Sequence, residues 1–138
     1  MTNAPITEAE VKTFIRDWFQ KLDNHPDPAR LLSMVSESLV MKMPEDEFQN
    51  HEGFIKWYRG VDRFRDQSHT VKALRIEIEG KTAIVKLINR WQRSDAKAQN
   101  SEEHLAFYAA QTWTLLRSPQ TQKLLIATYT VDYFLPEV

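Results

Sequence analysis

The spacing of the apolar residues changes once along the chain, near Ser68, and this change constrains the fold more than any other feature. Before it, apolar residues recur every three or four positions, and after it they alternate with polar ones. The first pattern is typical of helices and the second of strands. The segment 51–71, HEGFIKWYRGVDRFRDQSHTV, contains the change and predicts a short helix, an irregular turn and the start of a strand carrying His69. Helices segregated from strands indicate an α+β protein, and the length indicates one domain over 1–138.

The helices are expected in the first half of the chain. Thr7 followed by Glu10 forms a capping box, and six apolar residues at helical spacing come next. This pattern predicts a helix over about 8–23. A shorter helix is expected over Ala29–Val35, and a third one begins after Asn50, a residue type that caps helices well.

The strands are expected to form a short hairpin between the second and third helices and an antiparallel meander after the third. Residues 94–103, SDAKAQNSEE, are polar and predict a mobile loop. The last strands are fairly apolar on both faces, so both faces should be covered. We expect helices on one face and a second copy of the protein on the other. The expected strands are Leu39–Met43, Phe48–Gln49, Ser68–Glu79, Thr82–Arg93, His104–Arg117 and Gln122–Phe134.

Composition excludes several classes of function. The net charge is −1 and there is no basic stripe, which argues against nucleic acid as a partner. Apolar runs are too short to span a bilayer, the N-terminus lacks a signal core, and the absence of cysteine fits a reducing compartment, so a cytoplasmic location is expected. No glycine-rich phosphate loop is present, so no cofactor is expected. No metal is expected either, because the histidines lack ligand spacing; they are His25, His51, His69 and His104.

Five segments, in their order along the chain, resemble the NTF2-like superfamily and in particular its SnoaL-like branch. They are FIRDWFQKLDNH, GFIKWY, FRDQSHTV, AQTWTLLR and ATYTVDYF. The resemblance implies a cone-shaped, cystatin-like α+β fold, with three helices packed on the concave face of a curved mixed or antiparallel sheet. It also implies a deep pocket inside the cone and dimerisation through the outer sheet face. Its members include ketosteroid isomerases, scytalone dehydratases, polyketide cyclases and transport factors without catalytic activity, so the fold alone does not select a function.

The nearest chemical pattern among these families is that of the scytalone dehydratases, which use an acidic residue late in the first helix and histidines on the sheet. Asp23 and His69 stand at two of these places. The second histidine place falls near Asn89, and the family's tyrosine places fall near Leu22 and Met43, so this chain departs from the pattern there. The isomerase pattern, which has a tyrosine in the first helix, is also absent.

Asp23 and His69 are therefore the candidate catalytic residues. An imidazole beside a carboxylate in a pocket can act as a general acid or base near neutral pH. A carboxylate at the C-terminal end of a helix is disfavoured by the helix dipole, which favours a role in a pocket. The alternatives are a structural histidine bonded to backbone and a capping or solvated aspartate. Asp66, three residues from His69, is a second candidate for the carboxylate partner.

The expected ligand is a small hydrophobic molecule, bound by an aromatic wall with a few polar groups. Asn89 and Gln111 stand among apolar residues, so each needs a hydrogen-bond partner, which could be a ligand, a water molecule or the other amide. Two functions fit: cofactor-free dehydration, isomerisation or hydration of a hydrophobic or polyketide-like molecule, and a non-catalytic module for binding or dimeric interaction. The candidate ligand-binding residues are Trp18, Met41, Trp57, Tyr58, Asn89, Trp91, Gln111, Trp113 and Tyr129.

Overall fold

The structure is a computed structural model that describes residues 4–24, 27–61, 64–95 and 105–136. Most of the expected loop 94–103 therefore lies outside the described residues. The elements are α1 (Glu8–Asp23), α2 (Ala29–Leu32), β1 (Val35–Lys42), β2 (Glu47–Gln49), α3 (Asn50–Val61), β3 (Phe64–Glu79), β4 (Thr82–Asp95), β5 (Leu105–Arg117) and β6 (Leu124–Pro136). The α+β class and the order of helices and strands predicted from the sequence are confirmed.

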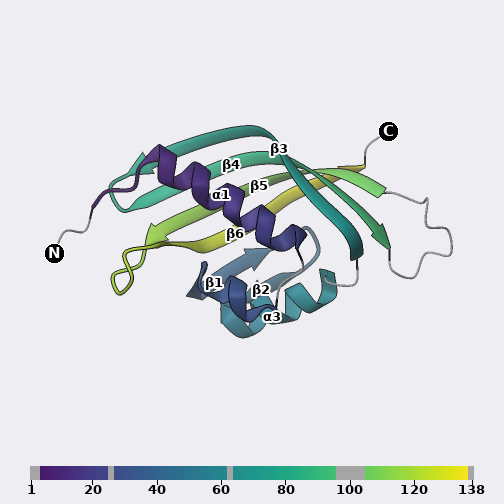
Figure 1. Cartoon of the computed structure of the whole chain (residues 1–138), viewed down its shortest axis with the longest axis horizontal. Coiled ribbons are helices and arrows are strands. Elements are labelled where there is room, and N and C mark those ends of the chain that lie inside the picture. Colours follow the sequence, from purple (N-terminus) through teal and green to yellow (C-terminus); the bar gives the residue numbers. More distant parts are fainter. Residues whose placement is uncertain (1–3, 25–26, 62–63, 96–104, 137–138) are drawn as a thin grey trace.

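One mixed sheet of six strands, in the order β2-β1-β6-β5-β4-β3, forms the body of the molecule. The last four strands in sequence, β3 to β6, pair antiparallel with one another, and β1 joins the sheet parallel to β6. Figure 1 shows the long strands curving together, with α1 across their concave face and α3 beside β1 and β2 at one end. The curved sheet and the three helices confirm the cone-shaped fold.

Helix α1 covers the concave face because its apolar residues form a single stripe. Its N-terminus has the expected capping box, in which Thr7 and Glu10 each accept a backbone hydrogen bond from the other. The stripe packs against the sheet, and it comprises the buried residues Val11, Phe14, Ile15, Trp18, Phe19 and Leu22. The polar opposite side of α1 remains in solvent, as expected for an amphipathic surface helix.

The short elements differ from expectation at one boundary. Helix α2 ends at Leu32 rather than continuing to Val35, which is instead the first residue of β1. Val35 pairs with Ile126 of β6, so ladder formation with a distant strand overrides the local helical pattern. The cap expected at Asn50 is present, because its Oδ1 accepts a hydrogen bond from the backbone of Gly53 at 3.2 Å.

Several bulges interrupt the strand ladders, and two of them change which side chains face the cavity end of the cone. In β3, Val71 pairs with Asn89 and Ala73 pairs with Ile88, so Lys72 is an extra residue without a counterpart in β4. In β6, Asp132 is an extra residue of the same kind opposite β5. A bulge reverses the alternation of side chains beyond it, because successive residues of a strand point to opposite faces.

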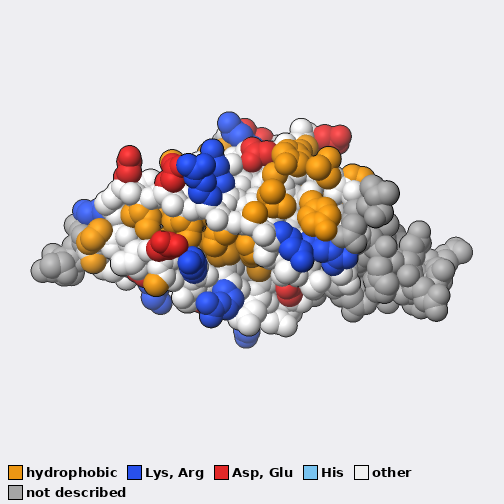
Figure 2. All heavy atoms as spheres, turned by 90° about the horizontal axis from the view of Figure 1, so that it is seen from above, with side chains coloured by type: hydrophobic (Ala, Val, Ile, Leu, Met, Phe, Trp, Pro, Cys, Tyr) orange, Lys and Arg blue, Asp and Glu red, His pale blue; other side chains and the backbone are white. Residues whose placement is uncertain are grey.

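The outer face of the sheet carries exposed apolar side chains. Ile84 and Ile88 of β4 are 39% and 36% exposed, and they point away from the concave face. Figure 2 shows one side of the molecule, where apolar side chains form a strip with both basic and acidic side chains around it. A second copy of the protein on the outer sheet face stays a prediction.

Candidate functional site

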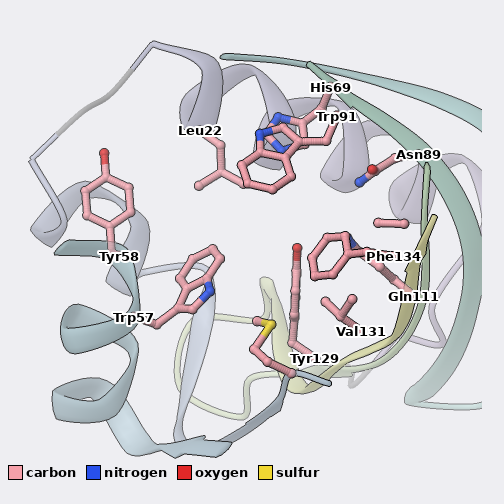
Figure 3. A pocket seen from close by; sticks show the side chains of 12 residues that line it. Leu22, Trp57, Tyr58, His69, Asn89, Trp91, Gln111, Tyr129, Val131 and Phe134 are labelled. Carbon is pink, nitrogen blue, oxygen red and sulfur yellow. The ribbon is translucent and has the colours of Figure 1, made fainter. Parts of the chain in front are cut away.

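A cavity of about 60 Å³ lies between the C-terminal end of α1, helix α3 and the concave face of the sheet (Figure 3). Its wall is mainly aromatic, with a few polar groups from the central strands. This composition is typical of sites that bind small molecules. The cavity lies where the sequence places the candidate residues, and seven of them line it: Trp57, Tyr58, His69, Asn89, Trp91, Gln111 and Tyr129.

The other three candidate ligand-binding residues, Trp18, Met41 and Trp113, lie in the hydrophobic core and not on the wall. Each is at most 1% exposed. The ring of Trp18 contacts those of Trp113 and Tyr129, with centroids 6.2 and 6.0 Å apart. Helix α1 therefore covers Trp113, and of these three rings only that of Tyr129 lines the cavity.

Some wall residues were not among the sequence candidates. Ala109 could have been found by alternation, since it lies two positions from Gln111 on the same strand face. Leu22 and Met43 could have been found from the resemblance, since they occupy the places of the family's tyrosines. Alternation would not have found Phe134, which lies beyond the bulge of β6. The additional wall residues are Leu22, Met43, Ala109, Val131 and Phe134.

The two candidate catalytic residues contact each other. Nδ1 of His69 lies 2.6 Å from Oδ1 of Asp23, and the backbone N–H of His69 donates to Oδ2 of the same carboxylate at 3.2 Å. With Nδ1–H donating to the carboxylate, Nε2 is left as the acceptor of a neutral imidazole. Asp66 lies in β3, but its side chain is outside the part of the chain that the structure describes.

Aromatic rings hold the imidazole of His69 in place. The ring stacks on Phe19 of α1 with centroids 4.9 Å apart and an angle of 21° between the planes. It also lies parallel to the indole of Trp91, 6.2 Å away, because His69 and Trp91 are opposite each other in the β3–β4 ladder. The side chain of His69 is only 10% exposed, whereas that of Asp23 is 26% exposed. The imidazole thus faces the cavity, and the carboxylate remains partly in solvent.

Three polar side chains line the deeper part of the cavity, and they differ in how far they are satisfied. Oε1 of Gln111 accepts a hydrogen bond from the indole N–H of Trp113 at 2.9 Å. Asn89 is fully buried, and neither its Nδ2 nor its Oδ1 has a partner among the described residues. Burial raises the pKa of the Tyr129 phenol well above its usual value. Tyr129 therefore stays neutral and points its hydroxyl into the cavity (Figure 3).

Other ionisable groups do not form a second centre in the described part of the chain. No group of three or more His, Cys, Asp or Glu side chains is arranged there to hold a metal ion. Nε2 of His51 bonds the carbonyl oxygen of Val35 at 2.9 Å and takes no part in the cavity wall. His25 and His104 lie outside the described residues. None of the described helices is long and apolar enough to cross a membrane.

Comparison with known proteins gives similar folds at low sequence identity. No protein-family model and no curated protein matches the sequence. A proposed scytalone dehydratase from Novosphingobium aromaticivorans is similar with a TM-score of 0.77 and 14% identity, over 94% of this chain and 83% of that one. A hexachlorocyclohexane dehydrochlorinase from Novosphingobium barchaimii is similar with a TM-score of 0.73 and 15% identity, over 94% and 89%.

The same fold also occurs in proteins named for transport rather than catalysis. Nuclear transport factor 2 from Cryptosporidium parvum is similar to this chain with a TM-score of 0.71 and 14% identity, over 94% of both chains. At such identities the similarity concerns the fold, and a function has to be argued from the site itself. The chain has the cone-shaped, cystatin-like fold of the NTF2-like superfamily.

Proposed function

We propose that the protein is a small enzyme that moves a proton on a small, mostly apolar molecule without a cofactor. The observation that carries this proposal is the 2.6 Å contact between the carboxylate of Asp23, which lies behind the cavity wall, and Nδ1 of His69, which lines the aromatic cavity. A base within a water-poor pocket needs an orienting partner that also stabilises its charged form. Asp23 meets both needs, and it does so from a different element than His69.

In the proposed reaction Nε2 of His69 removes a proton from a carbon atom of the substrate. The electron pair of the broken C–H bond forms a carbon–carbon double bond, and a leaving group departs with its own bonding pair. When hydroxide leaves, the imidazolium returns the proton to it, so that the net product is water; in an isomerisation the proton returns to another carbon. A positioned acid or base of this kind contributes roughly 10²–10⁴-fold to a rate.

The remaining wall supports this reaction through orientation and charge. The carboxylate of Asp23 stabilises the imidazolium that forms, while Phe19 keeps the ring in one plane. The neutral hydroxyl of Tyr129 can donate a hydrogen bond to negative charge that develops on the substrate. A dehydratase and a dehydrochlorinase, the activities named for two proteins of similar fold, both remove a proton and a neighbouring group.

The cavity volume limits the substrate. A volume of about 60 Å³ is several times the roughly 15 Å³ that holds one water molecule, yet it is small for a ligand site. We therefore propose a substrate of about one ring. A larger polyketide-like molecule would require Phe134, which is 39% exposed on this wall, to move outward.

Proton abstraction can be tested before the substrate is known. Cyclohexanone in D₂O exchanges the hydrogens next to its carbonyl, and NMR follows the rate. We expect the wild type to accelerate the exchange, His69→Gln to abolish the acceleration and Asp23→Asn to lower it about 10²-fold or more. His51→Gln is the matched control, because His51 lies off the cavity and should leave the rate unchanged.

The alternative is a module that binds an apolar molecule without chemistry, and the aromatic wall would serve it equally well. It is favoured if no variant differs from wild type in exchange while cyclohexanone still raises the melting temperature, since a ligand that binds only the folded state must do so. Exchange that survives in His69→Gln at the wild-type rate contradicts the catalytic proposal outright.

A further inference from the structure

The amide of Asn89 is an exception to the way buried polar groups are satisfied in this protein. The side chain is fully buried, it lines the cavity, and neither Nδ2 nor Oδ1 has a hydrogen-bond partner in the described part of the chain. Because both ends of the amide lack a partner, turning the amide over would change nothing. Buried polar groups are normally paired, so such a group calls for a missing partner.

None of the described side chains next to this amide serves as its partner. Across the sheet Asn89 is opposite Val71 on one side and Ala109 on the other, and both side chains are hydrocarbon. The Oε1 of Gln111 accepts instead from the indole of Trp113, and the Nδ1 of His69 contacts Asp23. Figure 3 shows the two polar atoms of Asn89 directed toward the open space of the cavity.

The space in front of Asn89 is open because its neighbour is small. Ala109 faces it from β5, where a larger side chain would fill the row between Asn89 and Phe134. Asn89 also lies close to the proposed base, since Trp91, two positions along β4, is the residue opposite His69. A molecule bound to the amide would therefore lie on the same wall as the imidazole.

We propose that Asn89 selects the substrate, by binding a carbonyl oxygen through Nδ2 and an adjacent N–H or O–H hydrogen through Oδ1. The ligand class is a small ring with a donor and an acceptor side by side on one edge, as in a lactam or an enolised hydroxyketone. This inference deepens the proposed function, and it rests on that function only in placing the ligand beside His69. It disfavours hydrocarbon and chlorinated rings, which would leave the amide unpaired.

Two ring molecules of similar size can distinguish a ligand with a donor and an acceptor on one edge from a purely apolar ligand. 2-Piperidone presents N–H and C=O side by side, whereas methylcyclohexane presents neither, and calorimetry measures the binding of both without any turnover. A missing hydrogen bond at a buried polar group corresponds to about 5- to 150-fold in affinity. We expect the wild type to bind 2-piperidone at least tenfold more tightly than methylcyclohexane, and Asn89→Leu to reverse this order.

The free protein provides a second readout. Leu has the branched shape of Asn and needs no partner, and the cavity in front of it has room for its larger methyl groups. Asn89→Leu should therefore melt at or above the wild-type temperature in the absence of ligand. Melting several degrees lower would mean that the amide is satisfied within the fold, for example by a buried water, and would overturn the proposal. Equal affinity of the wild type for both rings, or no binding of 2-piperidone, would overturn it as well.

The outcome for Asn89 and the outcome for catalysis can be told apart. His69→Gln should keep the preference for 2-piperidone while losing hydrogen exchange. If the wild type shows the preference but no exchange, the specificity role of Asn89 stands and the proposed catalysis fails. If exchange occurs and the preference is absent, the base is supported and the role of Asn89 is refuted.

Discussion

Deletion of Lys72 is expected to turn His69 out of the cavity. Lys72 is the extra residue of the β3 bulge, so its removal lets β3 pair with β4 without interruption. The side chains of β3 on one side of the former bulge must then switch to the opposite face of the sheet. The turn at Gly80 fixes the register of 73–79 against 82–88, because the two strands are joined there by a tight connection. The free end toward Phe64 should therefore be the part that turns over.

The energies favour the same outcome. Turning His69 outward loses the hydrogen bond to Asp23 and the stack on Phe19, which together are worth roughly 2–4.5 kcal/mol. Turning the other side outward would expose the inner face of 74–78, whose three apolar side chains are already partly exposed. At about 1–1.5 kcal/mol each, that costs roughly 3–4.5 kcal/mol and would also strain the turn.

Urea unfolding and NMR check both parts of this expectation. The deletion variant should lose roughly 2–4.5 kcal/mol of unfolding free energy and the low-field signal of the Nδ1–H of His69. Lys72→Ala, which keeps the length of β3 at an exposed position, should stay within about 0.5 kcal/mol of wild type. A deletion variant that keeps the imidazole signal and its stability would refute the assignment of the bulge as the element that orients His69.

Two further predictions concern parts of the fold away from the cavity. Arg117→Met should lower the free energy of unfolding by roughly 2–4 kcal/mol, because the guanidinium bonds the carbonyls of Ala4, Pro5 and Gln122 and the carboxylate of Glu10. The hydrogen bond from Arg117 holds the pKa of Glu10 below its usual 4.5, so the ionised carboxylate stabilises the fold above that pH. Glu10→Gln should thus be less stable than wild type at pH 7, and the difference in urea unfolding should shrink as the pH falls below about 4.5; a constant difference would contradict the assignment. Gly60→Ala should stabilise α3 by roughly 0.5–1 kcal/mol, since a Cβ there meets nothing within 4 Å, whereas Gly80→Ala should destabilise by about 1 kcal/mol because φ is +60°. Thermal unfolding that shifts in the same direction for both variants would contradict this.

The regular parts of the fold were predictable because local patterns and tertiary packing agree there. The stripe of α1 and its capping box predict the helix that the structure contains, and the alternation after Ser68 predicts long strands. The boundary near Val35 was wrong because its strand partner, Ile126, lies 91 residues away in sequence. No local pattern contains that information.

The candidate site was only partly predictable. The sequence does not show which inward-facing residues a helix covers, or where a bulge shifts the alternation of a strand. Residue type indicates that Trp113 is apolar and inward, but only the packing of Trp18 against it shows that α1 covers it. Alternation from Tyr129 would place Tyr133 inside, yet Tyr133 is 46% exposed and Phe134 lines the cavity. The extra residue Asp132 makes this difference, and single-residue bulges leave little trace in a hydrophobic pattern.

The bulges at Lys72 and Asp132 also determine which side chains of β3 and β6 reach the cavity. Away from the cavity, α1 covers side chains such as Trp113, which belong to the buried core. Beyond Lys72 and Asp132 the strands place His69 and Phe134 on the inner face, out of step with the alternation below. Strict alternation would have put Thr70 and Tyr133 at these positions, and neither is a base that works near neutral pH. The chain therefore uses the extra residues Lys72 and Asp132 to bring His69 and Phe134 to the cavity wall.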